Sequence, residues 1–126
     1  MKYVVVDLEM NRLANKFVEE KAVCGMEIIA IGAVLLDEQY SEIEAFKTLV
    51  KPQYNDVIGA YYTRLTGITT EMVENEPIFE KAFQKFFGWL HSVDDDIQIY
   101  QWSDTDLDQV TKEINLKHIQ IDAADR

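Results

Sequence analysis

The sequence predicts an α/β domain built on a mixed β-sheet, and three observations support this fold class. Three strand-like segments come first with no helical pattern between them, which favours an antiparallel meander. After Pro52 the apolar period becomes that of a helix, and a further strand and a second helix follow. A long helical crossover favours a parallel return, so we expect residues 99–101 to run parallel to residues 3–7.

Each of the first three strands has its own apolar pattern. Residues 3–8 form a run rich in β-branched side chains, and residues 27–37 form a second apolar run. The third strand lies within "SEIEAFKTLVKP", where alternation is expected to place Ile43 and Ala45 inward. The polar stretch 12–26 is expected to be a loop over one edge of the sheet.

The second half of the chain predicts two helices with a strand between them. A start signal at residues 75–77 precedes six apolar residues at helical spacing, which are Phe79, Ala82, Phe83, Phe86, Phe87 and Leu90. Residues 97–102, "IQIYQW", have the composition of a strand. The spacing of Leu107, Val110 and Ile114 then predicts the second helix.

Composition and length favour one domain spanning residues 1–126, because 48% hydrophobic residues suffice for a core. No apolar run approaches the roughly 20 residues needed to span a bilayer, and the N-terminus lacks a signal-peptide pattern. The single cysteine, Cys24, suits a reducing compartment. We therefore expect a soluble, cytoplasmic protein that does not contact membranes.

The net charge of −11 argues against a module that binds nucleic acid through a basic surface. It does not exclude an enzyme acting on nucleic acid. Divalent cations held by carboxylates can supply the local positive charge that a phosphate requires.

Two acids at the end of the first strand, Asp7 and Glu9, suggest a metal site. Residues two apart on a strand share a face, with Cα atoms roughly 6.5 to 7 Å apart. Like charges so close need a cation, and carboxylate oxygens favour Mg²⁺ or Mn²⁺. The alternative is that the strand simply ends there with both acids solvated.

Three more acids, Asp104, Asp106 and Asp108, follow the fourth strand where the second helix begins. Ligands of open α/β sheets gather beyond the carboxyl ends of the strands, so one of these acids is expected to face Asp7 and Glu9. Asp106 is the better candidate, since it borders the apolar face of the helix. Capping of the helix remains the alternative, particularly for Asp104.

Four segments together resemble one known family: "VVVDLEMN", "EIIAIGAVLLD", "YTRLTGITTEMVENEPIFEKAFQKFFGWL" and "IYQWSDTDLDQV". They are similar to the DEDD (DnaQ-like) 3′–5′ exonucleases, especially the branch of ribonuclease T-like and Eri-type RNA exonucleases. The resemblance implies a ribonuclease H-like fold in which four acids bind two divalent ions, Mg²⁺ or Mn²⁺. The first three acids would be Asp7, Glu9 and Asp106.

The same resemblance implies which residues meet the substrate, a single-stranded RNA or DNA 3′ end. Met10 and Asn11 would lie beside the terminal nucleotide. Leu65, in "LTGI", would wedge against the terminal base, although ordinary core packing is an equal alternative for this side chain.

The sequence departs from the family near its end. The family's last motif is a His followed, after four residues, by the fourth Asp, whereas His118 is followed at that spacing by Ala123, with Asp122 and Asp125 out of register. The resemblance therefore implies a domain that is incomplete at its C-terminus, lacking a helix that covers one face of the sheet. Exposed apolar surface there would favour a homodimer.

Two functions of different classes follow. One is a metal-dependent 3′–5′ exonuclease that uses two metal ions, with these 126 residues alone expected to be weak or inactive. The other is a non-catalytic remnant of that fold that binds nucleic acid or another protein.

Overall fold

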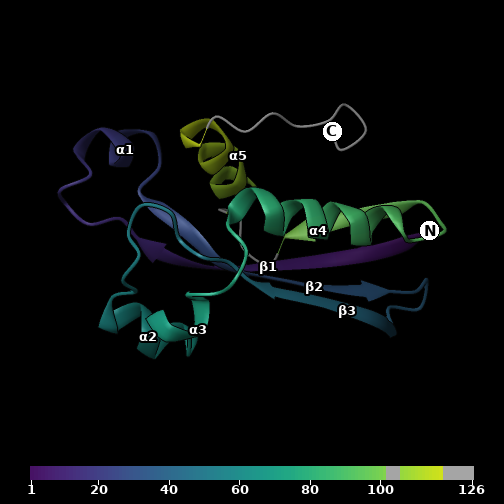
Figure 1. Cartoon of the computed structure of the whole chain (residues 1–126). Coiled ribbons are helices and arrows are strands. Elements are labelled where there is room, and N and C mark those ends of the chain that lie inside the picture. Colours follow the sequence, from purple (N-terminus) through teal and green to yellow (C-terminus); the bar gives the residue numbers. More distant parts are fainter. Residues whose placement is uncertain (102–105, 118–126) are drawn as a thin grey trace.

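The computed structural model describes residues 1–101 and 106–117, with the backbone alone for residues 106 and 107. Figure 1 shows the elements in space. In chain order they are β1 (Lys2–Arg12), α1 (Val18–Val23), β2 (Met26–Leu36), β3 (Glu42–Leu49), α2 (Ala60–Thr66), α3 (Thr70–Val73), α4 (Phe79–His91), β4 (Ile97–Gln101) and α5 (Asp106–Leu116).

The four strands form one mixed sheet in the order β3-β2-β1-β4. β2 pairs antiparallel with both β1 and β3, which confirms the predicted meander. β4 runs parallel to β1, from the pair Lys2–Ile97 to the pair Val6–Gln101, as the long crossover through α4 predicted. The carboxyl ends of β1 and β4 therefore point to the same edge of the sheet.

Helix α4 forms the main core with one face of the sheet, as its aromatic stripe predicted. Its side chains Phe79, Ala82, Phe83, Phe86 and Leu90 are buried against the alternate residues of β1 and β2. Burying each large apolar side chain contributes about 1.5–3 kcal/mol, so this layer supplies much of the stability. Figure 1 shows α4 and α5 on this side of the sheet.

The predicted facing of the third strand is wrong. Phe46 of β3 stacks on Trp89 of α4, and Glu44 accepts a hydrogen bond from the Trp89 indole N–H at 2.9 Å. Because side chains alternate along a strand, Ile43 and Ala45 lie on the opposite face, away from α4. The packing of one large aromatic ring decided the facing against the weaker Ile and Ala signal.

The opposite face of the sheet is covered at one end by α2 and α3 (Figure 1). A second core cluster lies there, made of Ile29, Ala30, Ile58, Ile68 and Val73. These two helices, and α1 within the predicted loop at residues 12–26, were not predicted. Neither α1 nor α2 buries a residue fully, so no apolar stripe marks them in the sequence.

Among the described residues, no helix is both long and apolar enough to cross a membrane. Several sequence predictions lie outside the described residues. They concern Asp104, His118, Asp122 and Asp125, together with a short strand expected at "KHIQID".

Candidate active site

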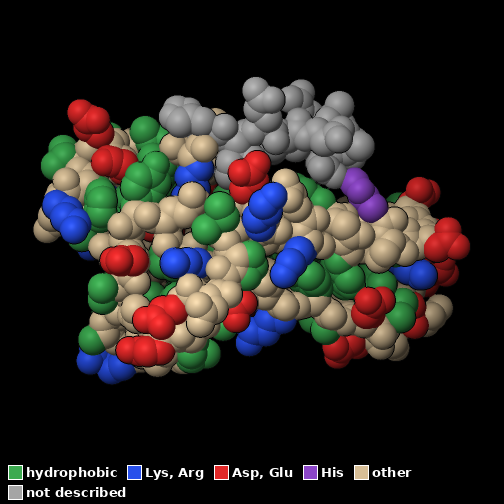
Figure 2. Space-filling model, viewed as in Figure 1, with side chains coloured by type: hydrophobic (Ala, Val, Ile, Leu, Met, Phe, Trp, Pro, Cys, Tyr) green, Lys and Arg blue, Asp and Glu red, His purple; other side chains and the backbone are tan. Residues whose placement is uncertain are grey.

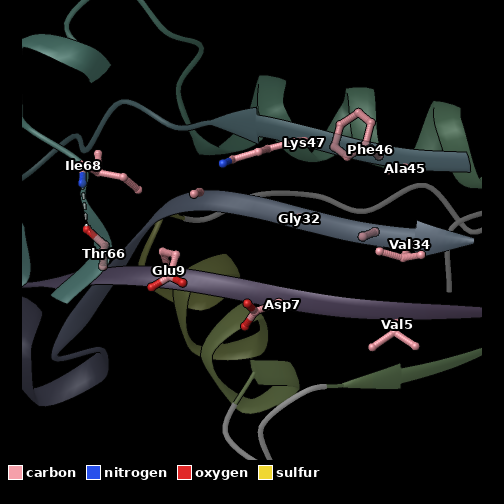
Figure 3. Close-up of a pocket in the computed structure, with 12 residues that line it drawn as sticks. Val5, Asp7, Glu9, Gly32, Val34, Ala45, Phe46, Lys47, Thr66 and Ile68 are labelled. Atoms are coloured by element: carbon pink, nitrogen blue, oxygen red, sulfur yellow. Dashed lines mark hydrogen bonds between the residues drawn. The ribbon is translucent and has the colours of Figure 1, made fainter.

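The paired acids Asp7 and Glu9 lie within β1 and face the same side of the sheet. Their predicted place at the end of the strand is wrong, because β1 continues to Arg12 by pairing with the start of β2. The even-numbered neighbours Val6 and Leu8 enter the core beneath α4, so alternation turns the two acids to the opposite side. Asp7 is exposed and Glu9 is partly exposed. Water therefore reaches both carboxylates, and the desolvation cost expected for a fully buried strand is avoided. Figure 3 shows the two side chains next to each other along β1.

Both acids line a groove with a volume of about 510 Å³, which is within the range of roughly 300–1,000 Å³ typical of ligand pockets. Small side chains form much of its floor. Thr66, the last residue of α2, and Ile68, between α2 and α3, close one end (Figure 3). The floor residues on the strands include Ala30, Gly32, Val34 and Ala45. The groove can therefore admit a flat or extended ligand close to the acids.

A row of paired strand residues crosses the groove from Asp7 to Lys47. Asp7 pairs with Gly32, and Gly32 pairs with Lys47 on β3. Two strand spacings put the Cα atoms of Asp7 and Lys47 roughly 10 Å apart. A Cβ atom on Gly32 would make only an ordinary 3.6 Å contact with the Asp7 carbonyl oxygen, but a longer side chain would fill the space between acid and base.

Lys47 was not identified as a site residue from the sequence. A signal for it existed, because Lys47 shares its alternation parity with Ile43 and Ala45. Treating that face of β3 as core hid the lysine, whereas the structure makes this face the wall of the groove. The groove thus combines two carboxylates with one ammonium group among its described lining residues.

The third predicted acid, Asp106, is the first residue of α5. Its backbone follows β4, whose last residue, Gln101, pairs with Val6 directly before Asp7. The topology therefore brings the start of α5 to the edge of the sheet where the acid pair lies. The side chain of Asp106 lies outside the described part of the structure.

Asn11 and Met10 follow the acid pair on β1 and are turned mainly inward. Asn11 is 1% exposed; its amide N–H donates to the Val57 carbonyl at 3.3 Å, and its amide oxygen accepts from the Gly59 N–H at 3.2 Å. Met10 is partly buried against the main core. In this arrangement Asn11 holds the backbone that leads into α2, and its predicted contact with a nucleotide remains a prediction.

Leu65, the predicted wedge residue, lies on α2 and is 67% exposed. This exposure excludes the alternative of ordinary core packing. The short helix begins after Gly59, which Asn11 holds, and ends at Gly67, whose φ of 78° places it in the left-handed region. Asn11, two residues after Glu9 on β1, thus fixes the start of α2, the helix that carries Leu65.

The donor chemistry of the acid pair fits a hard divalent cation. Two water-accessible carboxylates share one groove, and such oxygens are the ligands that Mg²⁺ and Mn²⁺ prefer. Among the described side chains, no group of three or more His, Cys, Asp or Glu residues is gathered closely enough to hold a metal ion. Within that part of the chain, Asp7 and Glu9 alone represent the predicted ligand set.

Comparison with known proteins gives one family and one fold. The family model RNase_T, described as exonuclease, matches residues 4–122. The ERI1 exoribonuclease 2 of Danio rerio is 37% identical over 78 residues, which are 61% of this chain and 14% of that protein. The PolC-type DNA polymerase III of Caldanaerobacter subterraneus is 35% identical over 85 residues, which are 68% of this chain and 5% of that protein.

A solved structure extends the likeness to the fold. The nuclease domain of 3'hExo, a DEDDh family member bound to rAMP, matches with a TM-score of 0.79 at 20% identity. The match covers 94% of this chain and 60% of that one. At this identity it establishes the shared fold, and the chain spans less than a fifth of the length of the two named relatives.

Proposed function

Because the chain belongs to the RNase_T exonuclease family, we propose that it is a metal-dependent 3′–5′ exonuclease acting on single-stranded nucleic acid ends. The observation that best supports this function is the pair of water-accessible carboxylates, Asp7 and Glu9, side by side in a groove on the face of the sheet, just beyond the last residue pair that joins β1 to the parallel strand β4. The reaction is hydrolysis of the terminal phosphodiester bond.

In the proposed site, Asp7, Glu9 and Asp106 hold Mg²⁺ or Mn²⁺. When bound, two such ions supply an activated water and stabilisation of the leaving oxygen. Asp7 and Glu9 would hold these ions at the groove, where the ions would supply the local positive charge that a phosphate requires. Lys47, across the groove from Asp7, offers its ammonium group to a second phosphate of the same strand.

The 3′-terminal nucleotide is proposed to lie toward α2. Leu65 projects from this helix with 67% of its surface exposed and can pack against a base. Met10 and Asn11 follow the acids on β1 and complete the proposed nucleotide-binding set. Both are turned mainly inward, and Asn11 acts by holding the backbone that leads into α2.

The proposed substrate includes both RNA and DNA. One relative is named an exoribonuclease and the other a DNA polymerase III. A 2′-hydroxyl distinguishes RNA from DNA only where donors and acceptors meet it. Paired RNA and DNA oligonucleotides of one sequence would separate the two substrates.

Metal binding is the first test. Calorimetric titration with Mn²⁺ should show weaker binding to Asp7→Asn than to the unchanged chain, because a carboxylate ligand is lost. Asp56→Asn, at an acid lining a different pocket, is the matched control and should bind as the unchanged chain does. Equal affinity for Asp7→Asn would remove Asp7 from the site.

Hydrolysis is the second test. A 5′-labelled single-stranded oligonucleotide should be shortened slowly from its 3′ end with Mn²⁺, and Asp7→Ala should abolish the shortening. Binding of the oligonucleotide without shortening would instead support the non-catalytic alternative. Failure of both binding and shortening would count against either function.

We also propose self-association through the face of the sheet opposite α4, at the end that α2 and α3 do not cover. Tyr40, Ile43 and Tyr100 are 66%, 50% and 46% exposed. Apolar side chains in such a patch favour burial against a second surface. Sedimentation velocity should show a dimer that Ile43→Lys weakens, and a monomer at high protein concentration would exclude it.

A further inference from the structure

Three charged side chains that the proposed chemistry does not use lie together beneath the surface. Glu27 of β2 and Glu113 of α5 have side chains that are 0% exposed, and the side chain of Lys117, directly after α5, is 4% exposed. The Lys117 ammonium nitrogen lies 3.0 Å from Glu27 Oε2 and 2.6 Å from Glu113 Oε2. Ionisable groups are rarely buried so completely unless they are paired.

The remaining capacity of Glu27 is satisfied by backbone. Its carboxylate accepts from the N–H groups of Gln53, Tyr54 and Asn55 at 2.9 to 3.3 Å. Three successive N–H groups around one anion form a preformed binding concavity. Glu27 is therefore fixed in position, and it in turn fixes where Lys117 can lie.

Glu113 connects the same cluster to the sheet beside the acid pair. Its Oε1 accepts from the Ile28 N–H and from the Gln109 side-chain amide, each at 2.9 Å. Ile28 pairs with Met10 at the register shift between Glu9 and Met10. Helix α5 is thus tied to β2 at the level of the sheet where the acid pair ends.

Hydrogen bonds and ion pairs of this kind fix the rotation and axial position of a helix. Gln109, Glu113 and Lys117 follow one another at intervals of four residues and so lie along one side of α5. Asp106 lies seven residues before Glu113, at a helical angle only roughly 20° away. Any turn or slide of α5 would move the Asp106 position with it.

We propose that the Glu27–Lys117–Glu113 cluster is a positioning device that fixes helix α5, and with it the backbone position of Asp106, at the edge of the sheet where Asp7 and Glu9 lie. This inference rests on the proposed function, because it gives Asp106 a role at the metal site. Apolar side chains could fill the same space, but they would not define one axial register as directional ion pairs do.

The first test measures the helix itself. Lys117→Met removes the cation, and Lys117→Met/Glu113→Gln also removes one carboxylate, which protects the fold from an uncompensated charge. Hydrogen exchange in α5 should be at least about 10-fold faster in both variants, with α4 unchanged. Lys112→Met is the matched control, because Lys112 pairs with Asp108 on the exposed side of the same helix and should leave exchange unaltered.

The second test measures Mn²⁺ binding by the free-ion spin resonance signal. The double variant should bind about 10-fold more weakly, as is typical when groups that orient metal ligands are lost. Lys112→Met should bind as the unchanged chain does. In an Asp106→Asn background the double variant should cause no further loss, because the positioned ligand is already gone.

The outcomes separate the two proposals. Unchanged Mn²⁺ affinity in the double variant, or the same loss with and without Asp106→Asn, overturns the positioning role. If Asp7→Asn also leaves Mn²⁺ affinity unchanged, the proposed metal site itself is wrong. Unaltered hydrogen exchange in α5 overturns the inference independently of any metal.

Discussion

The side of β1 that Asp7 and Glu9 face determines how much their charges cost the fold. In the sequence, Asp7 and Glu9 interrupt an apolar strand and so suggest buried charge. In the structure they face the groove, because Val6 and Leu8 already occupy the core side. Alternation therefore makes the acids tolerable even without a bound cation. A metal site is then a matter of function and not a requirement of folding.

The side chain of Asn11 leads to a prediction about stability. Asn11→Ala should lower the free energy of unfolding by about 1–3 kcal/mol, because the Val57 carbonyl and the Gly59 N–H lose their partner in a buried place. Asn15→Ala is the control, since Asn15 makes an exposed hydrogen bond with Lys21 and should change stability by less than about 0.5 kcal/mol. Urea unfolding measures both, and equal effects would contradict the role of Asn11.

The carboxyl of Glu113 leads to a prediction about pH. Burial raises its pKa above the ordinary value of 4.5, against the opposing effects of Lys117 and of the hydrogen bonds from Ile28 and Gln109. The Cys24 thiol interacts with this carboxyl, and Glu27 shares the Lys117 ammonium group with it. The folded state therefore keeps a proton that the unfolded chain releases, so the contribution of Glu113 to stability falls as pH rises from about 4.5 through the folded pKa. Glu113→Gln should remove this fall.

Urea unfolding between pH 4 and 8 measures the effect. The difference in free energy of unfolding between the unchanged chain and Glu113→Gln should decrease with rising pH and then level off. A difference that increases with pH would mean that Lys117 and the hydrogen bonds outweigh burial.

Among the elements, those with a strong period were predicted and those without one were not. The stripe of α4 and the apolar runs of β1 and β2 gave the main helix and the order of the sheet. The strand β1 extends to Arg12, beyond the predicted residue 8, because its last residues pair with the start of β2. That pairing depends on tertiary contact, which local apolar pattern does not contain.

The site was predictable to the extent that it follows strand geometry. Asp7 and Glu9 share a face because of the two-residue period, and the start of α5 reaches their edge because β4 is parallel to β1. Lys47 required the correct facing of β3, which depends on the contact of Phe46 with Trp89. The cluster around Lys117 joins residues 90 positions apart, so no local pattern could indicate it.

Two glycines in different helical positions predict opposite changes in stability. Gly67→Ala should destabilise the protein by about 1–2 kcal/mol, because its φ of 78° strains any side chain. Gly88→Ala should stabilise it by up to about 1 kcal/mol, since Gly88 lies inside α4 with open space where a Cβ would be. Thermal unfolding of the two variants gives the comparison, and changes of the same sign would contradict this account of α2 and α4.

The chain as a whole is acidic, and so is the nucleic acid proposed as its substrate. Its net charge is −11, and Figure 2 shows acidic and basic side chains interspersed on the visible face. Attraction of phosphate would then depend on local charge at the groove, from Lys47 and from cations held by the acids. The overall field opposes a nucleic acid that approaches elsewhere.

Oligonucleotide binding should therefore require divalent cations. Fluorescence anisotropy of a labelled single strand should show binding with Mn²⁺ and little binding in EDTA at matched ionic strength. Lys47→Met should weaken binding with Mn²⁺, whereas Lys81→Met, on α4 at the other side of the sheet, should not. Equal binding in EDTA would mean that the cations do not supply the charge.

The burial of the Lys117 cluster also bears on the order in which the molecule forms. The meander of β1, β2 and β3 brings together residues that are close in sequence, so it can form while the rest of the chain is unstructured. At that stage the Glu27 carboxylate is still hydrated, because its cation, Lys117, lies near the end of the chain and has not yet docked. We expect α5 to dock last, as the step that dehydrates Glu27, and pulse-labelled amide exchange during refolding should protect the meander before α5. A nascent chain would then form the acid pair early and dock α5, the helix proposed to carry the third acid, only at the close of folding.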